Sequence, residues 1–77
     1  MTFDYSKLRG KIREMVGTEG KFAKFMDMST TSLSEKLNNK VEFTQKEIER
    51  AVELLKIPKE EISVYFFTVK VQNAELL

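Results

Sequence analysis

The sequence predicts a single all-α domain built from five short helices. Along most of the chain, apolar residues recur at spacings of three and four, as on the buried face of an amphipathic helix. Residues that favour helix N-caps precede several of these stretches, and glycine or proline follows the first and the fourth. The 77 residues form one expected domain, 1–77, with a helical core over 5–66 and a tail over 67–77. The expected helices cover residues 5–16, 19–26, 30–38, 45–56 and 59–66.

The composition is that of a globular domain with a small core. Hydrophobic residues make up 42% of the chain and charged residues 32%, which is typical of folded proteins and not of disordered ones. The chain has neither cysteine nor histidine, so we expect no disulfide, no metal site, no cofactor and no small-molecule ligand. Oligomerisation is the remaining common way to stabilise so small a core, which favours a homodimer.

Charge and hydropathy bear on partners and location. Residues 1–40 contain eight Lys and Arg against five Asp and Glu, whereas the whole chain has a formal net charge of only +1. This basic front half is either a phosphate-attracting feature or an accident of a short chain. The sequence contains no run of ~18 apolar residues and no signal-peptide pattern, so we expect no membrane segment and a cytoplasmic protein.

The first two helices are predicted by their apolar faces and their boundary residues. Asp4 or Ser6 is placed to cap the first helix, and Gly17 to end it. Thr18 is the expected N-cap of the second helix, and Asp27 ends it because Asp tolerates left-handed backbone. The buried residues expected in these helices are Tyr5, Leu8, Ile12, Met15, Val16, Phe22, Ala23 and Met26.

The second half of the chain carries the clearest helix. Thr44 and Glu47 form a capping box that opens it, and Pro58 stops it and begins the fifth helix. Residues 67–71 then alternate between apolar and polar side chains, as in a strand. Such a strand must pair with another segment, for instance its copy in a second chain, and a disordered end is the other reading.

The helix expected over 30–38, capped by Ser29 or Thr30, is unusually polar. Ser, Thr and Asn are poor in helix interiors because their side chains compete for backbone hydrogen bonds. Leu33 and Leu37 hold one stripe against the core, which leaves a face of short polar side chains. Such a face suits phosphates and base edges in the DNA major groove, and two short helices joined by a turn form a helix-turn-helix unit.

Residues 5–66 resemble the five-helix DNA-binding domains of phage repressors, the lambda-repressor-like (XRE-type) group that includes Cro and CI proteins. The resemblance implies a sequence-specific transcriptional regulator of a phage or prophage, working in the cytoplasm of a bacterial host. A homodimer would bind double-stranded DNA and place helix 30–38 in the major groove of a palindromic operator. The resemblance rests on Phe22-Ala23, Met26-Asp27-Met28-Ser29, Leu33, Leu37-Asn38-Asn39-Lys40 and Ile48…Leu54-Leu55-Lys56-Ile57-Pro58.

The same resemblance implies a role for individual residues. Positions facing the bases are Thr30, Thr31, Ser34 and Glu35. Positions facing the DNA backbone are Lys21, Ser32, Asn38, Asn39, Lys40, Thr44 and Lys46. Dimer contacts are expected from the fifth helix and the tail, at Tyr65, Phe67, Val69 and Val71.

A second hypothesis is a protein-interaction module that binds and modulates a partner repressor through the same polar face. The near-neutral charge and three acids on that face, Glu19, Asp27 and Glu35, motivate it. Retention on heparin or bulk DNA at low salt would separate the two hypotheses. An enzyme is not expected, because the chain has no histidine for acid–base chemistry, no cysteine nucleophile and no glycine-rich phosphate loop.

Overall fold

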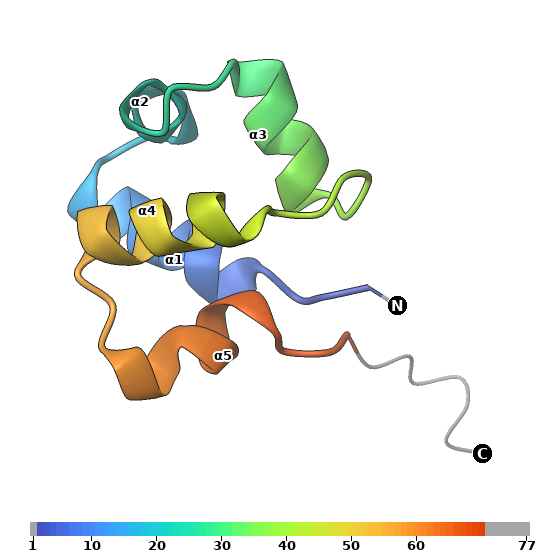
Figure 1. The fold of residues 1–77 in the computed structure, drawn as a ribbon. Coiled ribbons are helices and arrows are strands. Elements are labelled where there is room, and N and C mark those ends of the chain that lie inside the picture. The colour runs from blue at the N-terminus through green and yellow to red at the C-terminus, as the bar shows by residue number, and fades with distance from the viewer. Residues whose placement is uncertain (1, 71–77) are drawn as a thin grey trace.

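Helices account for nearly all the regular structure of residues 2–70, the part of the chain that the computed structural model describes (Figure 1). The all-α class is therefore confirmed, whereas membership of the lambda-repressor-like group stays a prediction. None of the helices in this part of the chain has the length and apolar character needed to cross a membrane. The α-helices are α1 (Ser6–Met15), α2 (Glu19–Phe25), α3 (Thr30–Leu37), α4 (Gln45–Leu55) and α5 (Ile62–Phe66), and the 3-10 helix η1 (Lys59–Glu61) directly precedes α5.

Side-chain caps begin α2, α3 and α4 at predicted residues. The hydroxyls of Thr18 and Ser29 each accept a hydrogen bond from a backbone N–H in the first turn of their helix. At α4 the capping box is complete, because the side chains of Thr44 and Glu47 each accept from the other's backbone N–H. At α1 the carboxylate of Asp4, one of the two expected caps, accepts from the first helical N–H. These contacts satisfy donors that have no partner within a helix.

Left-handed backbone lies at the end of four helices. Gly17 (φ 106°) follows α1 and Asp27 (φ 59°) follows α2, both as predicted. Asn39 (φ 64°) follows α3 and Lys56 (φ 54°) ends α4, and neither was predicted. A residue with a side chain adopts this conformation at a cost of roughly 1–2 kcal/mol, which other contacts must offset.

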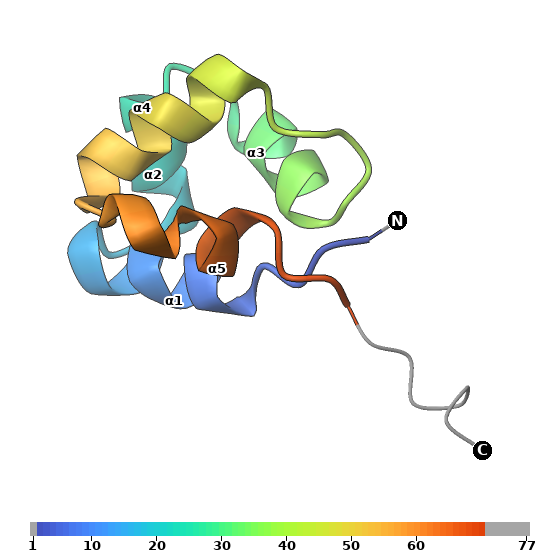
Figure 2. The same cartoon turned by 60° about the horizontal axis from the view of Figure 1, so that its bottom comes forward.

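The core forms around α1, which contacts α2, α4 and α5. Figure 2 shows α5 lying alongside α1, with α2 and α3 packed together on the other side of the molecule. Ala23 is 1% exposed where α2 meets α3, in line with the close helix crossing that a small side chain permits. Met15 was expected in the core but is 41% exposed. The buried apolar residues are Tyr5, Leu8, Ile12, Phe22, Ala23, Met26, Leu33, Leu37, Ala51, Leu55, Ile57 and Phe66.

The described part of the tail pairs with the beginning of its own chain. Phe3 and Val69 form an antiparallel β-bridge, flanked by backbone hydrogen bonds of 2.7 and 3.1 Å. This stretch was expected to pair, for instance, with its copy in a second chain. The backbone hydrogen bonds are instead formed within one chain, so a second copy is not needed for them. Val71 and the rest of the predicted tail lie outside the described residues.

Candidate functional site

The polar face of α3 is the leading candidate site. Leu33 and Leu37 are 1% and 3% exposed and hold the helix on the core, as their spacing predicted. The opposite side of this short helix faces solvent, so its side chains are free to meet another molecule. The structure brings together here the exposed residues that were predicted to face bases, Thr30, Thr31, Ser34 and Glu35.

Lys36 of α3 is turned away from this face. Its side chain lies 3.1 Å from the carboxylate of Glu47 and donates a 3.1 Å hydrogen bond to the carbonyl of Glu42. Burial works against ionisation of Glu47, but the Thr44 N–H and the Lys36 ammonium outweigh it and hold the pKa of Glu47 below its ordinary value. The pair fastens α3 to the N-terminus of α4. The position of Lys36 beside Leu37 on the buried stripe was the available signal for this role.

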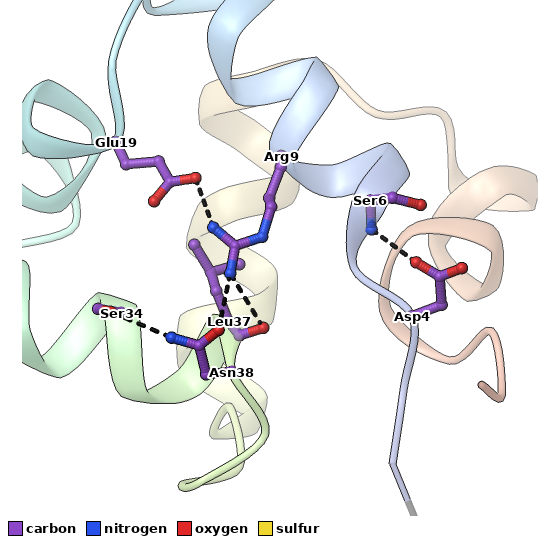
Figure 3. Close-up of polar contacts among 7 residues, drawn as sticks. All are labelled: Asp4, Ser6, Arg9, Glu19, Ser34, Leu37 and Asn38. Carbon is purple, nitrogen blue, oxygen red and sulfur yellow. Dashed lines mark hydrogen bonds and ion pairs between the residues drawn. The ribbon is translucent and has the colours of Figure 1, made fainter.

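Arg9 of α1 ties the start of α2 to the end of α3 (Figure 3). Its Nη1 donates to Glu19 Oε2 at 2.7 Å, and its Nη2 donates to Asn38 Oδ1 at 3.1 Å and to the carbonyl of Leu37 at 3.4 Å. The amide nitrogen of Asn38 donates onward to Ser34 Oγ at 3.3 Å. The guanidinium thus neutralises Glu19, one of the three acids expected on the polar face. It also engages the side-chain oxygen of Asn38 in a hydrogen bond.

Asn39 has a structural role that differs from the predicted contact with a DNA backbone. Its side-chain oxygen accepts from the N–H of Phe3 at 2.8 Å, and its side-chain nitrogen donates to the carbonyl of Phe3 at 2.9 Å. Both polar groups of the amide are therefore engaged within the chain. The tolerance of asparagine for left-handed backbone was the sequence signal that could have placed it after a helix.

The other side chains predicted to contact a DNA backbone divide into two groups. The hydroxyl of Thr44 is engaged in the capping box, and Ser32 is half-buried. Of these two, Ser32 is the less accessible one, and Thr44 is exposed. The remaining members, which are all exposed and free of these contacts, are the lysines Lys21, Lys40 and Lys46.

The surface of α2 and α3 carries nearly balanced charge. Glu19 and Lys36 are ion-paired to other helices. Binding to DNA depends on clustered cations that neutralise phosphates, and this face does not provide such a cluster. This face offers hydrogen-bonding groups of mixed charge without a strong field of either sign. The exposed charged side chains between residues 19 and 40 are Lys21, Lys24, Asp27, Glu35 and Lys40.

Two hollows adjoin the N-terminal segment, and both are lined in part by Phe3 and Tyr5. The polar one, about 230 Å³, lies at the end of α3 beside Arg9 and Asn38. The other, which we call the aromatic hollow, measures about 190 Å³ and is lined by five aromatic residues, one isoleucine and Glu42. Those aromatic residues are Phe3, Tyr5, Phe43, Phe66 and Phe67.

Tyr5 and Glu42 are electrostatically coupled at the aromatic hollow. Burial of the phenol, and after it the negative charge of Glu42, raise the pKa of Tyr5 above its ordinary value. The hollow therefore combines an apolar wall with a local negative charge. Sequence reasoning missed this site because its residues come from four separate segments of the chain.

The residues predicted for dimerisation lie in and around the last helix. Phe67 and Val69 are each 50% exposed, and Tyr65 is partly buried against the core. Val71 lies outside the described residues. The predicted dimer contact stays a prediction.

The fold defines a small all-α domain with one polar helix face open to solvent. Residues 1–69 match the family described as "Protein of unknown function (DUF739)", and the chain belongs to this family. The chain is also similar to a solved structure, that of the modulator of repression (MOR) of the temperate bacteriophage TP901-1 from Lactococcus lactis. The sequences are 44% identical, with a TM-score of 0.77, over 94% of this chain and 97% of that chain. No curated protein sequence matches the chain.

This relative overturns the first functional prediction and supports the phage association. It is named a modulator of repression and not a repressor, so the predicted DNA-binding repressor with a palindromic operator is wrong. The physical reason lies in the polar face itself. Asn39 and Asn38 are engaged within the chain, Lys36 is buried, and Asp27 and Glu35 offset the exposed lysines.

Proposed function

We propose that this protein is a non-enzymatic interaction module that binds a partner repressor and modulates repression. The observation that carries the proposal is the 44% identity, over nearly the full length of both chains, to a phage modulator of repression. The role requires a recognition surface and no catalytic group. It places the protein in the cytoplasm of a bacterial host, where a repressor meets its DNA.

The exposed side of α3 is the surface we assign to the partner. Its hydroxyl groups offer hydrogen bonds, and Glu35 offers a negative charge to a protein that must itself be basic in order to bind DNA. Arg9 and Lys36 anchor α3 to α1 and α4 from behind, so the helix is held in place before the partner arrives. Such preorganisation lowers the entropy cost of binding.

Direct binding to the repressor encoded in the same genome tests the proposal, with isothermal titration calorimetry as the measurement. We expect the double variant Thr31→Ala, Glu35→Ala to weaken the complex by roughly ten-fold or more, as truncations at the centre of an interface do. Glu53→Ala is the matched control, because Glu53 is an exposed acid in the last turn of α4, at the end of that helix away from α3 (Figure 1). No binding by the unmodified chain would contradict the proposal.

Chromatography on heparin and bulk DNA at low salt provides an independent test. A module that acts on a protein passes through both columns, because its polar face lacks clustered cations. Salt-sensitive retention together with enrichment of one DNA sequence would contradict the proposal. Self-association through the residues assigned to dimerisation is a separate prediction, which sedimentation measures.

A further inference from the structure

We propose that the aromatic hollow receives an arginine side chain of the partner repressor, an inference that rests on the proposed function. The hollow lies where the N-terminal segment, the loop before α4, α4 itself and α5 meet. Its volume of about 190 Å³ suits one long side chain and not a folded element. Two features support a cationic occupant: the rings and the charge of Glu42.

The rings around the hollow pack against one another at near-right angles. Phe43 packs against Tyr5 and Phe66 with ring centroids 5.4 and 5.5 Å apart and interplanar angles of 82° and 89°. Phe3 and Phe67 form another near-perpendicular pair, at 5.9 Å and 85°. Perpendicular rings turn electron-rich faces in different directions. A cation near such faces is attracted to them, and arginine occupies these positions more often than lysine.

Glu42 supplies the matching negative charge. Among the residues that line the hollow it is the charged one, and within residues 2–70 its carboxylate forms no ion pair. A purely apolar occupant would strip water from this carboxylate and leave it without a partner, which is costly. A guanidinium avoids that cost, because its planar N–H groups pair with a carboxylate while its face stacks on aromatic rings.

The loop that follows α3 connects the surface assigned to the repressor with the hollow, because Glu42 and Phe43 lie in that loop and line the hollow. A stable interface covers about 800 Å² on each partner, about a seventh of the 5581 Å² exposed by this chain. The exposed side of an eight-residue helix is smaller than that, so the contact must extend beyond α3. The loop after α3 leads directly to Glu42 and Phe43. Val41, which precedes Glu42 in this loop, and Phe67, which lines the hollow, are both exposed apolar residues. A DNA-binding partner carries the arginines that such a site selects.

Titration of the ¹⁵N-labelled full chain with N-acetyl-arginine amide, followed by NMR, tests the site. We expect chemical-shift changes confined to the residues lining the hollow, with the neutral isostere N-acetyl-citrulline amide producing none. Glu42→Gln should weaken arginine binding by about five-fold or more, because the cation then loses its carboxylate. Glu53→Gln, which changes the same charge on α4, should leave the affinity unchanged.

Several outcomes would overturn the arginine site. Equal shifts with citrulline amide, shifts located elsewhere, or tighter binding of leucine amide would each show that the hollow does not select a cation. Phe67→Leu is a second variant, and since Phe67 is half-exposed the fold tolerates it. It removes one ring, keeps an apolar wall and should weaken arginine amide without affecting the fold.

Calorimetry with the repressor separates this inference from the proposed function. If the repressor binds the unmodified chain and Glu42→Gln equally well, the arginine site is wrong and the proposed function stands. If arginine amide binds as expected while the repressor does not bind at all, the proposed function is wrong and the preference of the hollow for arginine stands.

Discussion

Asn39 joins two distant segments through one side chain. Its amide exchanges two hydrogen bonds with the backbone of Phe3, as a neighbouring strand would do. Its backbone has a φ of 64°, which reverses the chain after α3. The hydrogen bonds hold the N-terminal segment beside the end of α3, so Asn39 and the bridge to Val69 together determine where Phe3 lies.

Replacing Asn39 with alanine should lower the free energy of unfolding by about 3 kcal/mol. The loss combines two hydrogen bonds, each worth roughly 1 kcal/mol, with the cost of left-handed backbone for alanine. Asn39→Gly is the control, because glycine keeps the backbone conformation and loses the hydrogen bonds. Urea denaturation measures all three proteins. Unfolding free energies equal to that of the unmodified chain would show that the amide contributes nothing to stability.

Single-residue roles were the hardest to predict from the sequence. No role was predicted for Arg9, whereas it binds partners 10 and 29 positions away. A pattern of neighbouring residues carries no information on such pairs, because they meet only after the helices pack. By contrast, Asp27 was predicted correctly, since its left-handed conformation depends on the residue itself and its place between two helices.

At the level of secondary structure, the beginnings of helices followed the sequence closely. Thr18, Ser29 and Thr44 cap their helices, because a cap involves residues within one turn and is visible in the sequence. The fifth helix differed from its prediction over 59–66. Its first turn is the 3-10 helix η1, and the α-helical part begins at Ile62. This tighter first turn follows Pro58, whose backbone is extended.

The contact between α3 and α4 should give the protein a specific sensitivity to acid. The pKa of Glu47 in the folded chain lies below its ordinary value of 4.5, so its ionised form adds stability at neutral pH. That contribution is lost as the pH falls from about 4.5 through the folded-state pKa. Glu47→Gln should therefore cost about 1 kcal/mol at pH 7 and much less at pH 3.

Thermal unfolding of Glu47→Gln and the unmodified chain at both pH values measures this effect. Glu53→Gln is the control, since it removes an exposed carboxylate from the same helix without touching the contact with Lys36. A constant difference in stability between Glu47→Gln and the unmodified chain across this pH range would contradict the assignment.

On the scale of the whole molecule, the fold class was predicted correctly and the functional class was not. Apolar spacing reports where a chain buries its side chains, and this determines an all-α fold. The polar helix indicated a binding surface, yet the kind of partner depends on the net field of that surface. This field depends in turn on which charges are paired inside, such as Lys36 and Glu19, and single-sequence patterns do not reveal it.

Truncation after Phe66 should reduce the stability of the whole domain by about 1–2 kcal/mol. The change removes the two backbone hydrogen bonds between residues 2–4 and the tail, and the contact between Phe3 and Phe67. Truncation after Lys70 is the control, because it keeps all of these contacts. Urea denaturation measures stability, and sedimentation of the same samples reports whether the tail also supports a homodimer. Equal stability of the two truncated chains would show that the β-bridge contributes little.

The bridge between Phe3 and Val69 also brings residue 2 of the backbone next to residue 70, so the backbone between them almost closes into a ring. Because the backbones of Thr2 and Lys70 are joined by a 3.1 Å hydrogen bond, a short glycine linker could connect these two residues covalently without moving either one. A ring of this kind would restrict the unfolded chain far more than the folded one. The same geometry permits circular permutation, in which the linked chain is reopened at an exposed turn such as Gly17-Thr18.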